Sequence, residues 1–420
     1  MKHDVIIIGA GAAGLMAAIS ASGNNAKVLL LEKMSNPGRK LLITGKGRCN
    51  LTNIAPIEDF IKHFGRNGRF LRQVFQQFSP ENLVEFLQTR NVETVIERGG
   101  RVFPQSQKAI DVVEALKKGV REKDVVLCEN SRVEKLVIED KRIVGVQLSD
   151  DGKGEIVSGS AVIIATGGKS YPATGSTGDG YKMAEAAGHK INTPFPSLVP
   201  LVTQERVPEE LAGLTLKNVS AKLWIDGKKA GEEFGELEFA RHGLTGPIIL
   251  TLSKQVVTAL NANSKVDISI DLKPALDEKK LDLRLLRDLD NLGRRQFVNV
   301  LKELMPLKLI DLCIKQVSIA DDKPCHQVSS EERRTLRRWL KDFLWTITGH
   351  RGFREAIITS GGVDVKEIDP RTMGSRLIEG LYFAGEVLDV DADTGGYNLQ
   401  AAFSTGWMAG NSARIYAMGE

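Results

Sequence analysis

The sequence contains few cysteines, and their spacing excludes several kinds of site. Its four cysteines are Cys49, Cys128, Cys313 and Cys325, and no two of them form a C-x-x-C pair. This pattern argues against a structural zinc site, a thioredoxin-like dithiol and a disulfide framework. It is typical of a reducing compartment, so we expect a cytoplasmic protein without a bound metal.

Long apolar runs and a large net charge are also missing. Residues 1–23 have the basic start and apolar run of a signal peptide, but Asp4 and the regularly spaced glycines argue against one. No other stretch is apolar for long enough to cross a bilayer. The formal charge of +4 does not by itself indicate a nucleic-acid binder. We therefore expect no membrane partner; the oligomeric state stays open, with a monomer as the simpler expectation.

Glycine, in contrast, is abundant, and one glycine-rich segment near the N-terminus has a specific spacing. A β-branched run at residues 5–8 predicts a buried strand, and Gly9, Gly11 and Gly14 follow it as G-x-G-x-x-G before a helix-prone stretch. A second predicted strand ends in Glu32, 18 residues after Gly14, close to the roughly 20 of dinucleotide-binding folds. The order strand, helix, strand and acid predicts a dinucleotide site.

Each residue of this pattern has a distinct expected function. Gly9 makes the tight turn, Gly11 lets the backbone approach a pyrophosphate, and Gly14 lets helix and strand pack closely. The first turn of the helix, which includes Ala13, offers its amides to phosphates. Glu32 is then expected to accept hydrogen bonds from ribose hydroxyls.

Three further segments are similar to those of two-dinucleotide-fold flavoproteins. Residues 161–168, AVIIATGG, resemble their strand-plus-ATG motif, and residues 380–386, GLYFAGE, resemble their C-terminal strand. The resemblance implies that Glu386 meets the ribityl-phosphate region of FAD. Residues 395–400, GGYNLQ, open a last helix whose N-terminus is implied to face the flavin pyrimidine. A second G-x-G-x-x-G is absent, so we expect NAD(P)H to act only as a transient reductant.

A basic segment at residues 37–53, PGRKLLITGKGRCNLTN, follows Glu32. Its cations Arg39, Lys40, Lys46 and Arg48 are candidates to neutralise phosphates or the flavin N1–C2=O region. A solvated basic loop is the alternative. Further along, Asp389, Asp391 and Asp393 imitate a calcium loop, but the following glycine is one place late and Gln400 replaces the bidentate glutamate.

The basic segment closely resembles the signature of the BaiN/RdsA (YhiN-like) family of FAD-dependent flavoproteins. Residues 239–247, 358–363 and 384–405 extend the likeness over essentially the whole chain. Residues 177–188 are also similar to the TGDG stretch of fumarate-reductase-type flavoproteins, which pass hydride to an activated C=C bond. The fingerprint and these resemblances together assign FAD contacts to Gly9, Gly11, Ala13, Gly14, Glu32, Lys33, Arg39, Lys40, Thr44, Gly45, Gly47, Arg48, Asn50, Val133, Thr166, Gly167, Gly385, Glu386, Asp389, Gly396, Tyr397, Asn398 and Leu399.

The FAD pattern is interrupted in the middle of the chain, which predicts an inserted domain. We expect an α/β fold with a Rossmann-like FAD-binding domain of the two-dinucleotide-fold type, formed by residues 1–192 and 351–420. The insert at 193–350 reads as a β-barrel-like module at 193–272 and a helical subdomain at 273–345. Within it we expect strands at 198–202, 219–225 and 265–272, and helices at 279–315 and 330–344.

Two basic clusters are candidates for contact with ribosomal RNA, although solvated faces are the plainer interpretation. One comprises Arg333, Arg334, Arg337, Arg338 and Lys341, which fall largely on one helical face. The other comprises Lys62, His63, Arg66, Arg69 and Arg72. A phosphodiester backbone could bind along either one.

Reduced flavin offers hydride, so the protein must position an electron-poor carbon and supply a proton. Family resemblance implies two acceptors, a uridine of large-subunit ribosomal RNA and a steroid or bile-acid enone. We favour the RNA substrate because of the two basic clusters. A flavin-loaded RNA-binding or redox-sensing module without turnover is the alternative of another class. Candidate catalytic residues are Cys49, with a pKa expected to be lowered by nearby cations, together with Tyr397, His242 and its neighbour Arg241.

Overall fold

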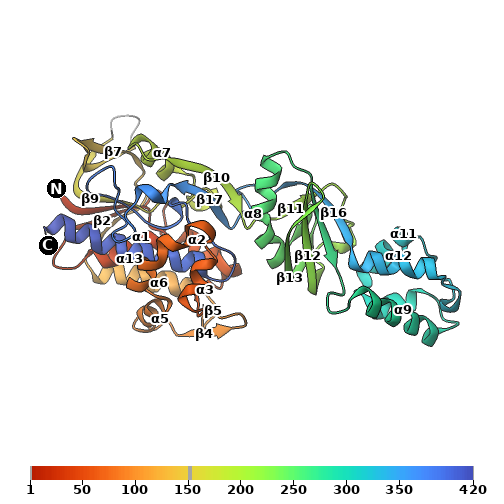
Figure 1. Ribbon diagram of the computed structural model, residues 1–420. Coiled ribbons are helices and arrows are strands. Elements are labelled where there is room, and N and C mark those ends of the chain that lie inside the picture. The colour runs from red at the N-terminus through yellow and green to blue at the C-terminus, as the bar shows by residue number, and fades with distance from the viewer. Residues whose placement is uncertain (1, 150–153, 420) are drawn as a thin grey trace. The chain divides into compact units, whose positions relative to one another are not determined.

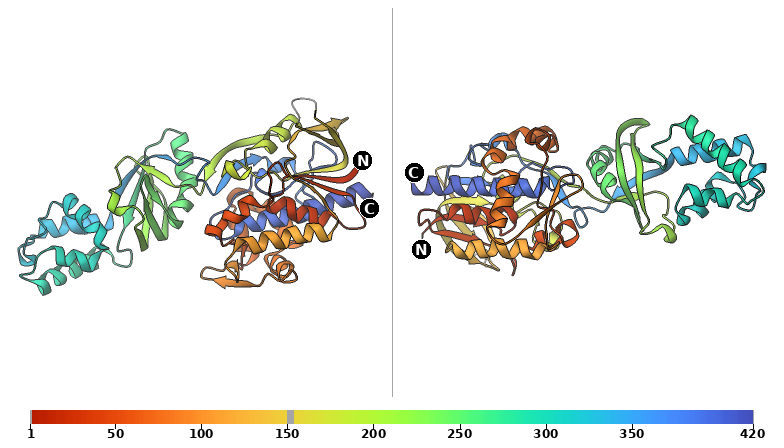
Figure 2. Two further views of the ribbon diagram at one scale, coloured as in Figure 1. Left: turned by 180° about the vertical axis from the view of Figure 1, so that it is seen from behind. Right: turned by 90° about the horizontal axis from the view of Figure 1, so that it is seen from below.

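The computed structural model describes residues 2–149 and 154–419. The chain divides into two compact units, one formed by Met1–Pro196 with Phe353–Glu420 and the other by Ser197–Gly352. Figures 1 and 2 show the red N-terminal and blue C-terminal segments side by side within the first unit. Both ends of the chain therefore build the same unit.

A seven-stranded sheet forms the centre of the first unit. Its order is β6-β2-β1-β9-β8-β7, and β18 pairs with β9. The pairs among β6, β2, β1, β9 and β18 are parallel, whereas β7 and β8 are antiparallel. The strands are β1 His3–Ile8, β2 Val28–Leu31, β6 Val126–Cys128, β7 Val133–Glu139, β8 Arg142–Leu148, β9 Ile156–Ile164 and β18 Leu381–Phe383. Residues 5–8 of β1 are all buried, as expected for a parallel strand covered on both faces.

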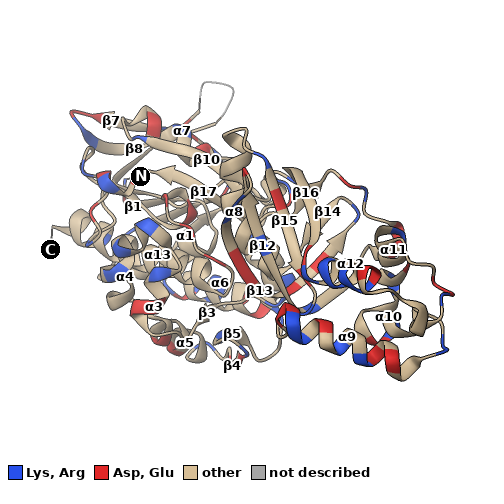
Figure 3. Cartoon of the chain, turned by 45° about the vertical axis from the view of Figure 1, so that its right-hand side comes forward, with Lys and Arg blue, Asp and Glu red and all other residues tan. Residues whose placement is uncertain are grey.

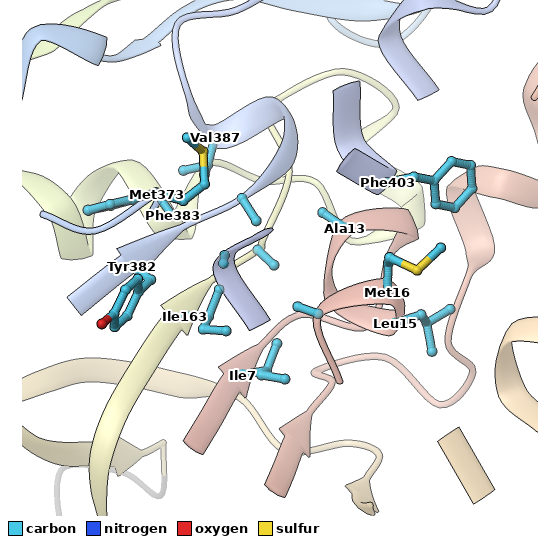
Figure 4. Packing of buried hydrophobic residues seen from close by; sticks show 14 of the residues in the cluster. Ile7, Ala13, Leu15, Met16, Ile163, Met373, Tyr382, Phe383, Val387 and Phe403 are labelled. Atoms are coloured by element: carbon cyan, nitrogen blue, oxygen red, sulfur yellow. The ribbon is translucent and has the colours of Figure 1, made fainter. Parts of the chain in front are cut away.

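Helices α1 (Ala12–Ala21) and α13 (Tyr397–Met418) pack against each other and the sheet. Small residues allow the close approach: a Cβ at Gly406 would lie 2.3 Å from the Ala13 carbonyl oxygen, and one at Gly410 would lie 2.2 Å from that of Ala17. Figure 4 shows Leu15 and Met16 of α1 and Phe403 of α13 among the buried side chains. The core thus joins the two ends of the sequence.

Smaller elements complete the first unit. β3 (Thr52–Asn53), β5 (Arg101–Pro104) and β4 (Thr94–Glu97) form a three-stranded sheet, and β10 (Ile191–Ser197) pairs with β17 (Ile358–Val363). The helices are α2 Arg39–Ile43, α3 Ile57–Lys62, α4 Arg72–Gln77, α5 Pro80–Gln88, α6 Ala109–Glu122 and α7 Asp179–Ala186.

The second unit contains a closed antiparallel barrel in the order β11-β14-β13-β12-β15-β16. The strands are β11 Leu201–Thr203, β12 Thr215–Ile225, β13 Lys228–Ala240, β14 Gly243–Thr245, β15 Val266–Asp271 and β16 Phe343–His350, and α8 (Pro247–Asn261) packs on the barrel. Its interior is apolar, with Phe239, Phe343 and Trp345 in mutual ring contact. The barrel and the parallel sheet confirm the expected fold class.

A helical part lies within the same unit, between β15 and β16 in sequence. Its helices are α9 Glu278–Leu292, α10 Val298–Leu304, α11 Leu307–Val317 and α12 Ser330–Lys341. The helices expected at 279–315 are α9, α10 and α11, whereas the expected end at 344 was wrong: α12 ends at Lys341 and β16 begins at Phe343. Among the described helices, none combines the length and apolarity needed to cross a bilayer.

Candidate functional site

The three fingerprint glycines have clearly different surroundings at the carboxyl end of β1. Gly9 has a φ of +98°, and a Cβ there would lie 2.8 Å from the Ala165 carbonyl oxygen. A Cβ at Gly14 would lie 1.8 Å from the Gly9 oxygen, which leaves no room for any side chain. At Gly11 a Cβ would meet nothing within 4 Å. Of these three glycines, only Gly11 faces open space. It lies at the start of α1, where this fingerprint typically places a pyrophosphate.

Glu32 stands at the carboxyl end of β2, beside that space. One carboxylate oxygen accepts from the Ala10 amide at 2.7 Å and the other from the Met34 amide at 2.8 Å. These two bonds fix the carboxylate and still leave acceptor positions free, because a carboxylate can take about four hydrogen bonds. Nearby, Lys33 is held by Thr177 and Asp179. Glu32 can therefore bind ribose hydroxyls without rearranging.

The motif after β9 contributes an unpartnered polar atom. Among the described residues, the Thr166 hydroxyl is buried without a hydrogen-bond partner. A Cβ at Gly180 would lie 2.1 Å from that hydroxyl oxygen, so α7 closes one side of it. A buried hydroxyl needs a partner, and a bound ligand would supply one. Val133, another expected contact, is buried at the start of β7.

Glu386 joins four segments through its carboxylate. One oxygen accepts from the Thr359 amide at 2.7 Å and the Ser170 hydroxyl at 2.9 Å, and the other from the Lys40 ammonium at 2.6 Å. Lys40 also donates to the Ser170 hydroxyl. The sequence did not single out Ser170 or Thr359 as site residues, although Thr359 lies in a segment that carries the family likeness.

The basic segment at 37–53 does not present all of its cations in the same way. Arg48 donates to Glu97 and Gln107 and lies over the Phe103 ring, whereas Arg39 contacts the Ala173 oxygen. Lys46 is exposed. Of the four cations expected to meet cofactor phosphates or the flavin N1–C2=O region, Arg48 is paired with Glu97 and Lys40 with Glu386.

The start of α13 packs directly on this segment. A Cβ at Gly396 would lie 2.3 Å from the Thr52 oxygen, and Asn53 donates to the Gly395 oxygen at 3.1 Å. Asn50, with its amide oriented to satisfy its neighbours, accepts from the Gly396 amide at 3.0 Å. The Asn398 side chain bonds both the amide and the carbonyl of Ala392. Two signatures far apart in the sequence thus form one surface.

The aspartates of the calcium-like spacing have separate partners. Asp389 is buried and accepts from Arg66 and Asn192, whereas Asp393 contacts the His63 ring. Within residues 2–149 and 154–419, no group of three or more His, Cys, Asp or Glu side chains could hold a metal ion. The Asp389 side chain therefore anchors the segment between α3 and α4.

The candidate catalytic residues belong to both units, Cys49 and Tyr397 to the first and Arg241 and His242 to the second. Cys49 is fully buried, and burial raises the pKa of its thiol to about 12 despite a hydrogen bond to Thr44 that lowers it. The expected low-pKa thiol is therefore wrong. Burial also raises the pKa of Tyr397. Arg241 and His242 are exposed in the turn between β13 and β14 of the second unit.

The basic stripe of α12 is largely neutralised inside the second unit. Arg333 and Arg337 both pair with Asp282 of α9 at 3.2 Å, Lys341 pairs with Asp271, and Arg334 with Glu331. Figure 3 shows blue basic and red acidic positions along the ribbons of α9 and α12. The pairs of Arg333 and Arg337 link α12 to α9, so the basic face expected on α12 is largely paired, and Arg338 is its one basic residue without an ion pair among the described residues.

The basic cluster of the first unit differs. Lys62 pairs with Asp59 and Arg72 with Glu58, but Arg69 is exposed without an ion pair among the described residues. Arg66 contacts the buried Asp389 at 3.3 Å while 80% of its side chain remains exposed. Cationic groups thus remain available next to the start of α13.

Comparisons with known proteins agree with this geometry. Residues 3–412 match the family described as HI0933-like protein Rossmann domain. The chain is 33% identical over 409 residues to the 3-dehydro-bile acid delta(4,6)-reductase of Clostridium scindens, covering 97% of this chain and 98% of the relative. It is 30% identical over 410 residues to the ribosomal RNA dihydrouridine synthase of Escherichia coli, covering 97% and 96%.

Solved structures show the same fold at lower identity. The 3-ketosteroid delta1-dehydrogenase of Sterolibacterium denitrificans superimposes with a TM-score of 0.55 at 14% identity, covering all of both chains. A flavocytochrome c3 fumarate reductase in its open conformation gives 0.54 at 18% identity, covering 99% of this chain and 79% of the other.

The fold and the site define an FAD-dependent oxidoreductase. The open space at Gly11, the anchored Glu32 and the unpartnered Thr166 hydroxyl fit the cofactor. The chain belongs to the HI0933-like Rossmann family. The chain is therefore an enzyme, and the alternative of a redox-sensing module without turnover is wrong.

Proposed function

We propose that this enzyme reduces the C5=C6 bond of a uridine in large-subunit ribosomal RNA, forming dihydrouridine. The support is the full-length similarity to relatives from Escherichia coli and Haemophilus influenzae that are named ribosomal RNA dihydrouridine synthase. Such a substrate agrees with the cytoplasmic location expected from the cysteine pattern. We also propose NAD(P)H as the transient reductant, since the sequence lacks a second dinucleotide fingerprint.

The chemistry sets the tasks of the protein. Bound FAD, when reduced, supplies a hydride, and the uracil C5=C6 bond is an acceptor because it is conjugated with the C4 carbonyl. The chain must orient the base, exclude water and deliver a proton to complete the reduction. The surface formed by residues 50–53 and the start of α13 is the proposed location of these tasks, because it joins the family signatures.

The exposed guanidinium of Arg66 is the observation that favours RNA. Its contact with Asp389 holds the side chain from behind, and most of the side chain remains open to solvent. Arg69 adds a second exposed cation one helical turn away. Cations of this kind bind phosphates, which RNA carries and a neutral steroid nucleus lacks.

A single-turnover experiment tests the proposal. The FAD-loaded enzyme is reduced anaerobically and mixed with unmodified large-subunit ribosomal RNA. Stoichiometric reoxidation together with dihydrouridine, detected by nucleoside mass spectrometry, is the expected result. Unchanged RNA nucleosides and a flavin that stays reduced would refute the RNA substrate.

A small-molecule enone is the second candidate, favoured by the 33% identity to the bile-acid reductase. The same reduced enzyme is mixed with a 3-oxo-4,6-diene steroid. Fast reoxidation by the steroid with no reaction of the RNA would move the assignment to this class.

A further inference from the structure

One histidine of the basic cluster at residues 62–72 is in ring contact with the first residue of α13. His63 directly follows α3, and its ring lies parallel to that of Tyr397, with centroids 4.0 Å apart and an angle of 19°. Tyr397 is the first residue of α13, where residues 395–398 carry the flavoprotein signature. His63 therefore lies at the surface that the two signatures form.

Asp393 fixes the orientation of this ring. Its carboxylate lies 3.0 Å from His63 Nδ1, and its amide donates to the His63 carbonyl at 3.4 Å. A hydrogen on Nδ1 lets the ring donate to this carboxylate, and Nε2 is then the ring nitrogen that Asp393 does not contact. About a third of the imidazole, 36%, is exposed.

The surroundings hold this pair rigidly. The Asn398 side chain bonds Ala392 and the Asp393 carbonyl and so fixes the loop that carries the carboxylate. The Phe60 ring meets Tyr397 edge-on at 4.7 Å. A group held by packing and hydrogen bonds needs little reorganisation when it acts. Asp59 on α3, which pairs with Lys62, is a further charged group close enough to His63 to interact with it.

The other candidate acids in the first unit are less suited to exchange protons with solvent. The Cys49 thiol is fully buried, and only 6% of Tyr397 is exposed, with its ring covered by His63 and Phe60. His63 combines an accessible imidazole with a carboxylate that sets its tautomer. This combination is the usual arrangement of a histidine acid.

We propose that His63, oriented by Asp393, is the acid that delivers the proton in the reduction, an inference that rests on the proposed function. Hydride adds to the β carbon of the conjugated double bond, and the displaced electron pair passes to the α carbon as an enolate. The proton on Nε2 forms the new C–H bond at the α carbon, which leaves a neutral imidazole that solvent reprotonates. Asp393 acts as the positioning residue.

Two variants and one control test this role in FAD-loaded enzyme. His63→Asn should slow substrate-dependent reoxidation in single turnover at saturating RNA by about 100-fold, while reduction of the flavin by dithionite is unchanged. Asp393→Asn should slow it by about tenfold, since the ring remains but its tautomer is no longer fixed. His326→Gln, an exposed histidine in the second unit, should react at the wild-type rate. A wild-type rate in His63→Asn would overturn the proposal.

A readout independent of turnover separates this role from a structural one. In protein labelled with 15N-histidine, long-range NMR correlations should show His63 as the Nδ1–H tautomer, and Asp393→Asn should change that signal. An Nε2–H tautomer, or a signal that Asp393→Asn leaves unchanged, would contradict the proposed orientation. If wild-type enzyme does not react with RNA, the proposed substrate fails; the His63 variants are then compared with the dienone steroid, where the same loss is expected.

Discussion

The two units use charged side chains for different purposes. In the first unit, two ion pairs beside the site connect residues far apart in the chain: Lys40 with Glu386, 346 positions away, and Arg66 with Asp389, 323 positions away. In the second unit, Arg333 meets Asp282 only 51 positions away and holds two neighbouring helices. The first pattern closes both ends of the sequence around the site, whereas the second stabilises a scaffold. Similar runs of basic residues therefore do not imply similar functions.

The largest effect is expected from the glycines that close the first unit. Gly14→Ala places a Cβ 1.8 Å from the Gly9 oxygen, so it should destabilise folding by more than about 3 kcal/mol and give colourless protein. Gly11→Ala meets open space and should keep stability within about 1 kcal/mol while weakening FAD binding. Thermal unfolding and flavin titration measure both. Equal loss of stability in the two variants would contradict the assignment of Gly14 to helix packing and of Gly11 to FAD binding.

A smaller effect should distinguish the long-range from the short-range ion pairs. Glu386→Gln removes the charge that balances Lys40. It should lower the free energy of unfolding by about 2 kcal/mol and reduce the amount of FAD that the protein retains. Asp282→Asn removes the carboxylate that pairs with Arg333 in the second unit. It should lower the free energy of unfolding by at most about 1 kcal/mol and leave the flavin content unchanged. Urea unfolding with flavin absorbance compares them. Loss of flavin from Asp282→Asn would weaken the comparison.

Buried thiols provide a test of both units under alkaline conditions. Burial raises the pKa of Cys49 in the first unit and of Cys313 in the second to about 12, from a model-peptide value of 9.0. Because the thiols stay neutral in the folded protein, their contribution to folding stability is complete below pH 9. This contribution is lost as the pH rises from 9 to 12. Each thiol should remove about 1.4 kcal/mol of stability per pH unit in that window. Cys49→Ala and Cys313→Ala should each flatten the alkaline stability curve; an unchanged slope would contradict the burial.

The smallest effect concerns RNA affinity. Arg69→Gln should lower the affinity for a ribosomal RNA fragment and reduce the slope of log affinity against log salt by about 1, since one exposed cation is lost. Arg337→Gln should leave that slope unchanged, because Arg337 is already paired with Asp282 and Glu278. Filter binding at several salt concentrations provides the data. A larger change in Arg337→Gln would restore α12 as the RNA track.

The sequence predicts local geometry well and long-range contacts poorly. The fingerprint glycines, the barrel and the inserted helices follow from short patterns whose physical reasons act over a few residues. The sites of Glu386 and Arg48 could not be read in this way, because their partners Ser170, Thr359 and Glu97 are identified only once the chain is folded. The low-pKa hypothesis for Cys49 was wrong because neighbouring cations in sequence say nothing about desolvation. His63 carried no signal beyond its basic neighbours.

The paired strands β10 and β17 have a consequence for the evolution of this architecture. The chain leaves the first unit through β10 and returns through β17, and the two strands are hydrogen-bonded neighbours. Both connections to the second unit therefore run next to this one pair of strands, so a module can be exchanged at this junction without altering the parallel sheet of the first unit. New specificities can therefore arise by grafting, while the redox half of the protein is inherited intact.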